Sequence, residues 1–183
     1  MMISKKLRLF APVLLTIAVS ACGYNVNPYG ASVANVDQIR AAQVNPVAVS
    51  SFTSSKPGSS SIGCRAAGPV ETADKSSFES YIEKAFIDEL KLAGVYDPNS
   101  PLVINGHLEE LDFNSSIGAG KWIMRLAVST KEESGYTVES IHEFSTNWVA
   151  DKACQQVAQA FAPAVQSLIS KLVSDPRFQT LVK

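Results

Sequence analysis

The sequence predicts an α+β domain, in which a small, mainly antiparallel sheet carries two helices packed on one face. Two segments have apolar residues at helical spacing, at about 76–93 and 152–173. Between them lie three segments in which apolar and polar residues alternate, as they do in half-buried strands. A short β-branched segment precedes the first helix. The order is therefore strand, helix, three-strand meander, helix, and two amphipathic helices can cover one face of such a sheet.

Residues 1–21 have the features of a bacterial lipoprotein signal peptide. Three basic residues precede an apolar run from Leu9 to Val19, and Val19-Ser20-Ala21-Cys22 then forms a lipobox. The apolar run is shorter than the roughly 20 residues of a membrane-spanning helix. Cleavage by the ordinary signal peptidase is the alternative, since Val19 and Ala21 are small enough for that enzyme.

Cys22 is the expected lipidation site. Its thiol can accept a diacylglycerol, and the acyl chains, palmitate among them, would supply the two membrane signals that stable anchoring requires. Gly23 follows, where Asp would favour retention at the inner membrane. The sequence thus predicts a protein of the cell outer membrane, anchored by lipid and facing the periplasm of a Gram-negative envelope.

Removal of the signal peptide leaves 162 of the 183 residues, enough for one domain with a sizeable core. Of the 16 Lys and Arg residues, three lie in the signal, so 13 remain against 17 Asp and Glu residues. The mature chain is acidic and has no basic cluster. Nucleic acid is therefore not an expected partner.

Cys64 and Cys154 remain after Cys22 is acylated, and disulfides persist in an oxidising compartment. We expect them to form a disulfide bond. The alternatives are two buried free thiols, or a reactive Cys64 near His107 or His142. A nucleophilic cysteine needs a base and a lowered pKa, and only Arg65 lies near Cys64 in the sequence.

The domain is expected to begin at residue 47. Residues 22–46 contain several Asn, Pro and Gly residues and no sustained apolar period, which predicts a lipidated N-terminus with a flexible tether. The first strand is expected at 47–52. Residues 53–75 are rich in Ser and Gly and predict a long loop, which Cys64 would fasten to the domain. A single periplasmic domain then covers 47–183.

The first helix is expected to begin at the capping box Ser76-x-x-Glu79 and to end at Gly94. A strand follows at 102–113. Its apolar residues change phase in the middle, so a bulge near Glu109 and Glu110 would keep both sets inward.

Two more strands are expected at 121–130 and 136–149, joined by a hairpin turn at 131–135. Trp122 would face inward from the first of them, and Tyr136 and Trp148 from the second. The last helix is expected at 152–173 with Asp151 as its cap, followed by a final turn. Its apolar stripe comprises Cys154, Val157, Ala158, Phe161, Val165, Leu168, Ile169 and Leu172.

Residues 47–183 resemble the YajG-type lipoproteins of Gram-negative envelopes. The resemblance is carried by the lipobox, the Leu102-Val-Ile-Asn105 strand that enters the meander, and the closing Ser174-Asp-Pro-Arg-Phe178 segment. Those proteins are similar in layout to small α+β lipoproteins that work by binding in lipopolysaccharide assembly and curli secretion. The resemblance implies no catalytic residues. The pair Cys64 and Cys154 and the loop 64–69 depart from the family pattern.

No chemical motif is complete. Gly118-Ala-Gly120-Lys121 lacks the other residues of a phosphate-binding loop and predicts a hairpin turn. Ser32 lies in a sequence similar to a nucleophile elbow but outside any strand–turn–helix unit. His107 and Glu109 are too few for a metal site, and Glu109, Glu110 and Asp112 are typical of a solvated strand edge. We therefore expect no catalytic residue, no metal and no cofactor.

Three classes of function are compatible with these features. The first is a non-enzymatic interaction or assembly module with an envelope protein partner, contacted through the Ser/Gly-rich loop or an exposed sheet edge. The second is an auxiliary lipoprotein of an envelope transport system, which binds lipid or a transporter. A hydrophobic groove between Trp122, Trp148 and the last helix would favour it. The third is a hydrolase, which would need His107, His142 and a carboxylate in one cleft.

Overall fold

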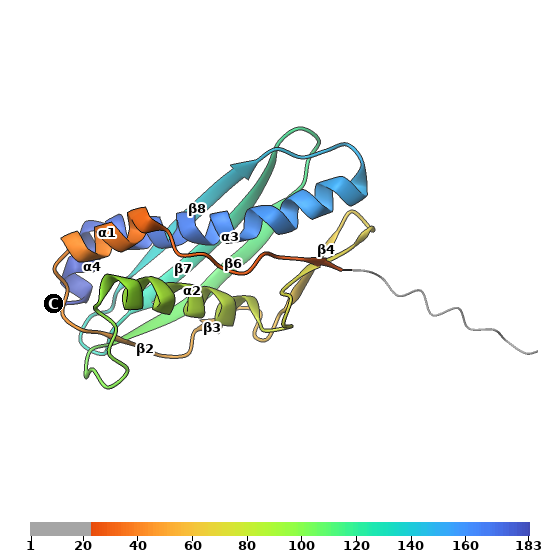
Figure 1. Ribbon diagram of the computed structural model, residues 1–183. Helices are drawn as coiled ribbons and strands as arrows, with labels where there is room; N and C mark the ends of the chain where they lie inside the picture. The colour runs from red at the N-terminus through yellow and green to blue at the C-terminus, as the bar shows by residue number, and fades with distance from the viewer. Residues whose placement is uncertain (1–22) are drawn as a thin grey trace, which may run out of the picture.

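The structure is a computed structural model that describes residues 23–183; the signal peptide and Cys22 lie outside the described residues. The described residues form an α+β domain with two mixed sheets and four helices, which confirms the predicted class (Figure 1). The elements are β1 (Tyr24–Asn25), α1 (Val33–Ala41), β2 (Ala48–Val49), β3 (Thr53–Ser54), β4 (Ser61–Cys64), β5 (Gly68–Glu71), α2 (Phe78–Ala93), β6 (Val103–Asn114), β7 (Gly120–Ser129), β8 (Tyr136–Phe144), α3 (Ala150–Ser174) and α4 (Pro176–Leu181).

The larger sheet is built on the predicted meander. Strands β6, β7 and β8 pair antiparallel, while the short strands β2 and β3 pair parallel with β6. The helices lie together on one face of this sheet (Figure 1). Helix α3 packs against β7 and β8, and α2 packs against β6. The opposite face of the meander is not covered by any helix that the structure describes.

The predicted bulge in β6 is present, because the register with β7 shifts between Leu108 and Glu110. On either side of it, Leu108 pairs with Leu126 and Leu111 pairs with Met124. The extra residue returns the second apolar set to the face that packs on the helices. Trp122, which was predicted to face inward from β7, is fully buried, and the residues at alternate positions are fully or almost fully buried, namely Met124, Leu126 and Val128.

Helix α2 ends at Gly94 as predicted, with a left-handed conformation at φ 81°. Its N-cap is Ser77 and not Ser76, since the Ser77 side chain accepts a hydrogen bond from the Ser80 backbone N–H. Glu79 does not close a capping box. Its carboxylate instead accepts a hydrogen bond from the Gly58 backbone N–H at 2.8 Å, which ties the preceding loop to the helix.

Trp122 fastens α3 to the sheet. Its indole is fully buried, and its Nε1 donates a hydrogen bond to the Val157 carbonyl at 3.0 Å. The ring packs edge-on against Phe161 of α3 and Phe113 of β6, with centroid distances of 4.9 Å to both. The predicted apolar stripe of α3 is buried along its whole length, and the helix continues through Pro163.

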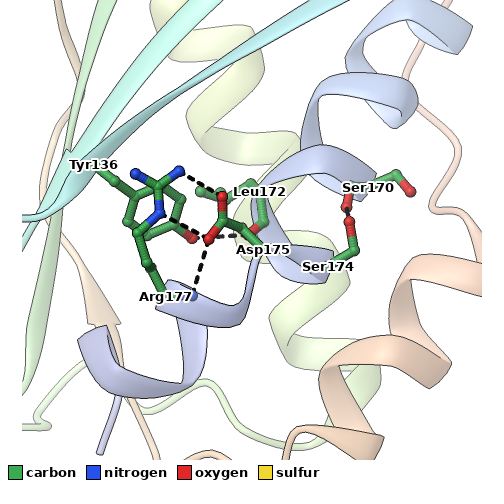
Figure 2. A network of polar contacts seen from close by, with 6 residues as sticks. All are labelled: Tyr136, Ser170, Leu172, Ser174, Asp175 and Arg177. Carbon is green, nitrogen blue, oxygen red and sulfur yellow. Dashed lines mark hydrogen bonds and ion pairs between the residues drawn. The ribbon is translucent and has the colours of Figure 1, made fainter.

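A polar network closes the junction of α3 and α4 (Figure 2). The Tyr136 hydroxyl donates to the Leu172 carbonyl at 2.8 Å, and the Arg177 guanidinium lies 4.5 Å from the Tyr136 ring centroid. Asp175 caps α4 and pairs with Arg177, and these hydrogen bonds lower the pKa of Asp175 to about 2. Phe178, Leu181 and Val182 pack into the core, as expected for the final turn.

The flexible tether predicted for residues 22–46 is wrong for the residues that the structure describes. Residues 33–41 form α1, which packs on α2 and α3 and buries Val36 and Ile39 completely or nearly so. This helix was not predicted from the sequence, because the apolar stripe along it is narrow. The folded domain therefore includes residues before 47, and the predicted start at residue 47 is wrong.

A buried carboxylate explains why the polar N-terminal segment folds. Glu89 of α2 is fully buried and accepts hydrogen bonds from the Tyr29 hydroxyl, the Ser32 backbone N–H at 3.0 Å and the Asn35 amide at 3.2 Å. The Asn35 amide also donates to the Gln166 carbonyl of α3 at 3.0 Å. Burial raises the pKa of Glu89 above its ordinary value, and the three donors oppose that effect.

The long loop predicted for 53–75 is only partly a loop. Strand β3 pairs with β6, and β4 and β5 form an antiparallel hairpin that β1 extends into a second, three-stranded sheet. Strands of two to four residues are too short to show a periodic pattern in the sequence. The strand predicted for 136–149 is also too long, because β8 ends at Phe144 and the following residues form a connection to α3.

Candidate functional site

Strand β1 places the start of the described chain at one end of the domain. Tyr24 and Asn25 pair parallel with Val70 and Glu71 of β5. Because the pairing is parallel, Gly23 lies on the side of β1 that is next to the start of β5 and the β4–β5 turn. The Tyr24 hydroxyl donates a hydrogen bond to the Asp151 carboxylate at 2.8 Å, which fixes β1 against the start of α3. Asp151 thus binds β1, and the predicted Asp151 cap is absent because Val149 is the N-cap.

The predicted disulfide joins Cys64 and Cys154 at this same end. Cys64 is the last residue of β4 and Cys154 lies in the first turns of α3, with their Cα atoms 5.8 Å apart. Both residues are buried. The bond fastens the small sheet to the long helix and excludes the alternative of a reactive Cys64.

Arg65 connects the β4–β5 turn to two further segments there. Arg65 and Ala66 form the β4–β5 turn with φ of 44° and 54°, the two positive values that suit a tight hairpin. The guanidinium donates to the Ser115 hydroxyl at 3.1 Å and to the carbonyls of Asn147 and Trp148 at 3.0 and 3.4 Å. The sequence indicated a turn after Cys64 but not these contacts, because their partners lie 50 or more residues away.

The β6–β7 turn lies beside the connection that leads to α3. The Gly118 N–H donates to the Thr146 carbonyl at 3.3 Å, and the Thr146 hydroxyl donates to the Ser116 carbonyl. Residues 115–119 form the predicted hairpin turn, with Gly118 at φ 85°. We call the end built from β1 and residues 65–67, 115–119 and 145–149 the disulfide end.

The disulfide end exposes two large apolar side chains. Ile117 is 73% exposed and Trp148 is 76% exposed. Trp148 was expected to face inward with Trp122, and that prediction is wrong because Trp148 follows β8. The predicted hydrophobic groove between Trp122, Trp148 and the last helix does not form, because Phe113 and Phe161 pack against the Trp122 ring.

The acidic cluster borders a cleft at the bulge of β6. The Arg125 guanidinium pairs with Glu109 at 2.8 Å and lies 3.9 Å from Glu110. The cleft, of about 290 Å³, is lined by Glu79, Glu110 and Asp112, and also by Lys56 and several serines. One Glu79 carboxylate oxygen is buried and has no hydrogen-bond partner among the described residues. The cleft is therefore polar and partly charge-balanced.

The two histidines lie on opposite faces of the larger sheet. His107 projects to the open face, where its Nδ1 lies 2.8 Å from the Thr53 hydroxyl and its Nε2 lies 3.4 Å from the Ser55 hydroxyl. His142 projects toward α3, where its Nδ1 lies 3.0 Å from the Ser167 hydroxyl and partial burial lowers its pKa. The structure therefore does not bring them together in the cleft that a hydrolase would need.

The structure also shows the position of Ser32 and of the side chains that could bind a metal ion. Ser32 is the N-cap of α1, and its hydroxyl accepts a hydrogen bond from the Asn35 N–H at 3.4 Å. Within residues 23–183, no three His, Cys, Asp or Glu side chains are grouped so that they could hold a metal ion. None of the helices in the same range is both long and apolar enough to cross a membrane.

Comparisons with known proteins find a distant structural neighbour. No known protein family and no curated protein matches the chain. Among solved structures, the chain is similar to protein XCC0632 from Xanthomonas campestris, which is assigned to the family DUF330. The similarity has a TM-score of 0.48 and 8% sequence identity, over 87% of this chain and 94% of that chain. The resemblance to the YajG-type lipoproteins stays a hypothesis.

Proposed function

We propose that this protein is a lipid-anchored lipoprotein of the Gram-negative outer membrane, which acts from the periplasmic side as a non-enzymatic interaction or assembly module of the YajG type. The lipobox at Cys22 is the observation that carries the anchor. The bond between Cys64 and Cys154 supports an oxidising compartment such as the periplasm. Anchoring by acyl chains fits a described domain without a membrane-spanning helix.

Metabolic labelling tests the anchor. Cells that express the full chain are grown with a palmitate analogue, and the labelled protein is recovered from membrane and soluble fractions. We expect label and membrane association in the wild type, and loss of both in Cys22→Ser. A wild-type protein that matures without label would overturn the anchor and leave ordinary signal cleavage as the explanation.

The open face of the meander is the proposed contact surface. It presents a cross-strand row in which Arg125 lies between Glu110 and Glu139, and a neighbouring row with Ile123 opposite Ile141. Ile141 is 51% exposed. An apolar centre beside charged rows is typical of a protein interface with a polar rim. Strand β8 is also the outer strand of the described sheet, where a partner strand can pair.

Site-specific photocrosslinking in intact cells tests this surface. A photoreactive residue at position 141 should form a discrete adduct with an envelope protein, which mass spectrometry then identifies. Leu92 of α2 is the matched control, since it is 56% exposed but lies on a helix away from the open face. Equal adducts from both positions, or adducts from Leu92 alone, would contradict the proposed surface. A transporter among the adducts would favour the auxiliary-lipoprotein function instead.

A further inference from the structure

The disulfide end has no flexible spacer between it and the proposed anchor. Cys22 is joined to Gly23 by one peptide bond, which separates their Cα atoms by about 3.8 Å. Gly23 directly precedes β1, which is paired with β5 and hydrogen-bonded to the start of α3. An acyl chain on Cys22 would therefore hold this end of the domain close to the lipid headgroups.

The same end carries the most exposed tryptophan side chain of the domain and a neighbouring exposed isoleucine. Trp148 and Ile117 belong to two segments that hydrogen-bond each other through Thr146 and are held by Arg65. Exposed tryptophan prefers the membrane–water interface, where its ring contacts acyl chains and its N–H stays hydrated. Both side chains lie at the end of the domain that the proposed anchor would hold at the membrane. A lipid surface is therefore the partner that we expect them to contact.

We propose that the disulfide end lies flat on the phospholipid surface that holds the anchor, with Trp148 and Ile117 inserted at the level of the headgroups. This inference rests on the proposed function, because it requires acylation of Cys22. The anchor would keep both side chains near the bilayer, which gives them a high effective concentration at its surface. Contact of Trp148 and Ile117 with lipid can then be populated even if it is weak for the free domain.

The proposed contact fixes the orientation of the whole domain. Helix α3 begins at the disulfide end, and its 25 residues span about 37 Å at 1.5 Å per residue. The C-terminus lies at the opposite end of the molecule from β4, which belongs to the same small sheet as β1 (Figure 1). That end, which includes α4, would then project away from the membrane, and the open face of the meander would stay accessible to a partner protein.

Tryptophan fluorescence on vesicles tests the proposal. Purified acylated protein is incorporated into vesicles of phosphatidylethanolamine and phosphatidylglycerol, and quenching by aqueous acrylamide and by brominated lipids is measured. We expect a blue shift of the Trp148 emission, loss of acrylamide quenching and gain of quenching by the brominated lipids. Trp148→Phe should abolish these changes, because the remaining Trp122 is fully buried.

A matched control places the only exposed tryptophan elsewhere. In the Trp148→Phe background, Leu92→Trp puts the indole on α2, where it should stay open to acrylamide and unaffected by brominated lipids. If acylated protein binds the vesicles but Trp148 behaves like the residue at position 92, the orientation is wrong and the anchor stands. If the protein is not acylated and does not bind, the proposed function fails. If Trp148 is protected from acrylamide in native envelopes but not on vesicles, Trp148 and Ile117 contact a protein and the proposal is overturned.

Discussion

At the residue scale, the bond between Cys64 and Cys154 determines how firmly the small sheet is held. It closes a loop with a sequence separation of 90 residues. The chain-entropy relation gives up to about 4.6 kcal/mol of stabilisation for such a loop. We expect Cys64→Ser to lower the free energy of unfolding by an amount approaching this value, measured by denaturant titration under oxidising conditions.

The double variant with both cysteines replaced by serine is the control for the lone thiol that the single variant leaves. It should lose a similar amount of stability, and added reductant should weaken the wild type alone. Equal stability of the wild type and both variants without reductant would contradict the bond.

The buried carboxyl group of Glu89 should make the stability of the folded protein depend on pH. Burial raises its pKa in the folded state above the ordinary value of 4.5. Below that ordinary value both states hold the proton, and as the pH rises the unfolded state ionises first, so the contribution of this group to stability falls. Glu89→Gln keeps an acceptor for Tyr29 and Ser32 and cannot ionise. Its melting temperature should therefore rise relative to the wild type between about pH 4.5 and neutrality.

The exposed Glu132 in the β7–β8 turn supplies a control of the same chemistry. Glu132→Gln should keep the pH profile of the wild type, measured by thermal melting over the same range. A difference between Glu89→Gln and the wild type that is constant with pH would contradict the role assigned to burial.

At the element scale, the β7–β8 hairpin depends on Gly135. Its φ is 76°, and a Cβ atom there would lie 1.7 Å from the Val128 carbonyl oxygen. Gly58 has a similar φ of 73°, but a Cβ atom there would meet nothing within 4 Å. We expect Gly58→Ala to cost about 1–2 kcal/mol for the backbone conformation, and Gly135→Ala to cost clearly more because the strand must also move. Chemical denaturation of both variants measures the difference.

The elements that the sequence predicted well are those with long periodic patterns. Helices α2 and α3 and strands β6 and β7 each bury one regular face, so alternation or helical spacing is visible along the chain. The bulge near Glu109 was predictable because Leu111 and Phe113 leave the phase of Leu108. The boundary of β8 was not, because Phe144 and Trp148 continue a plausible alternation after the strand has ended.

At the scale of the whole molecule, helix α1 makes the N-terminal segment part of the core. Ile39 is fully buried between α2 and α3, whereas Val33 on the same helix is 76% exposed. We expect Ile39→Ala to lower the free energy of unfolding by about 2–5 kcal/mol because it leaves a cavity. Val33→Ala should change it by less than about 0.5 kcal/mol. Thermal and denaturant unfolding of the two variants would show equal effects if residues 33–41 were a tether.

Cys22, Cys64 and Cys154 show how far the chain itself determined the candidate site. The lipobox is a local pattern that depends on neighbours in the sequence alone. The pairing of the other two cysteines followed from their number in an expected oxidising compartment, and the structure confirms it. The contacts of Arg65 and the exposure of Trp148 could not be predicted, since both depend on segments that only the fold brings together.

The sequence by itself determined the fold class, the meander, the two amphipathic helices and the expectation of an anchor, because periodic burial and short motifs are local properties. Only the tertiary structure decided that residues 23–46 are folded. The Asn35 amide donates a hydrogen bond to Glu89 across 54 residues, and no local pattern predicts such a contact. The fold also decided that β1 lies at the same end of the domain as Trp148 and Ile117. The proposed anchor at Cys22 is thereby joined by a proposed membrane-facing surface, which residues 65–67, 115–119 and 145–149 form together.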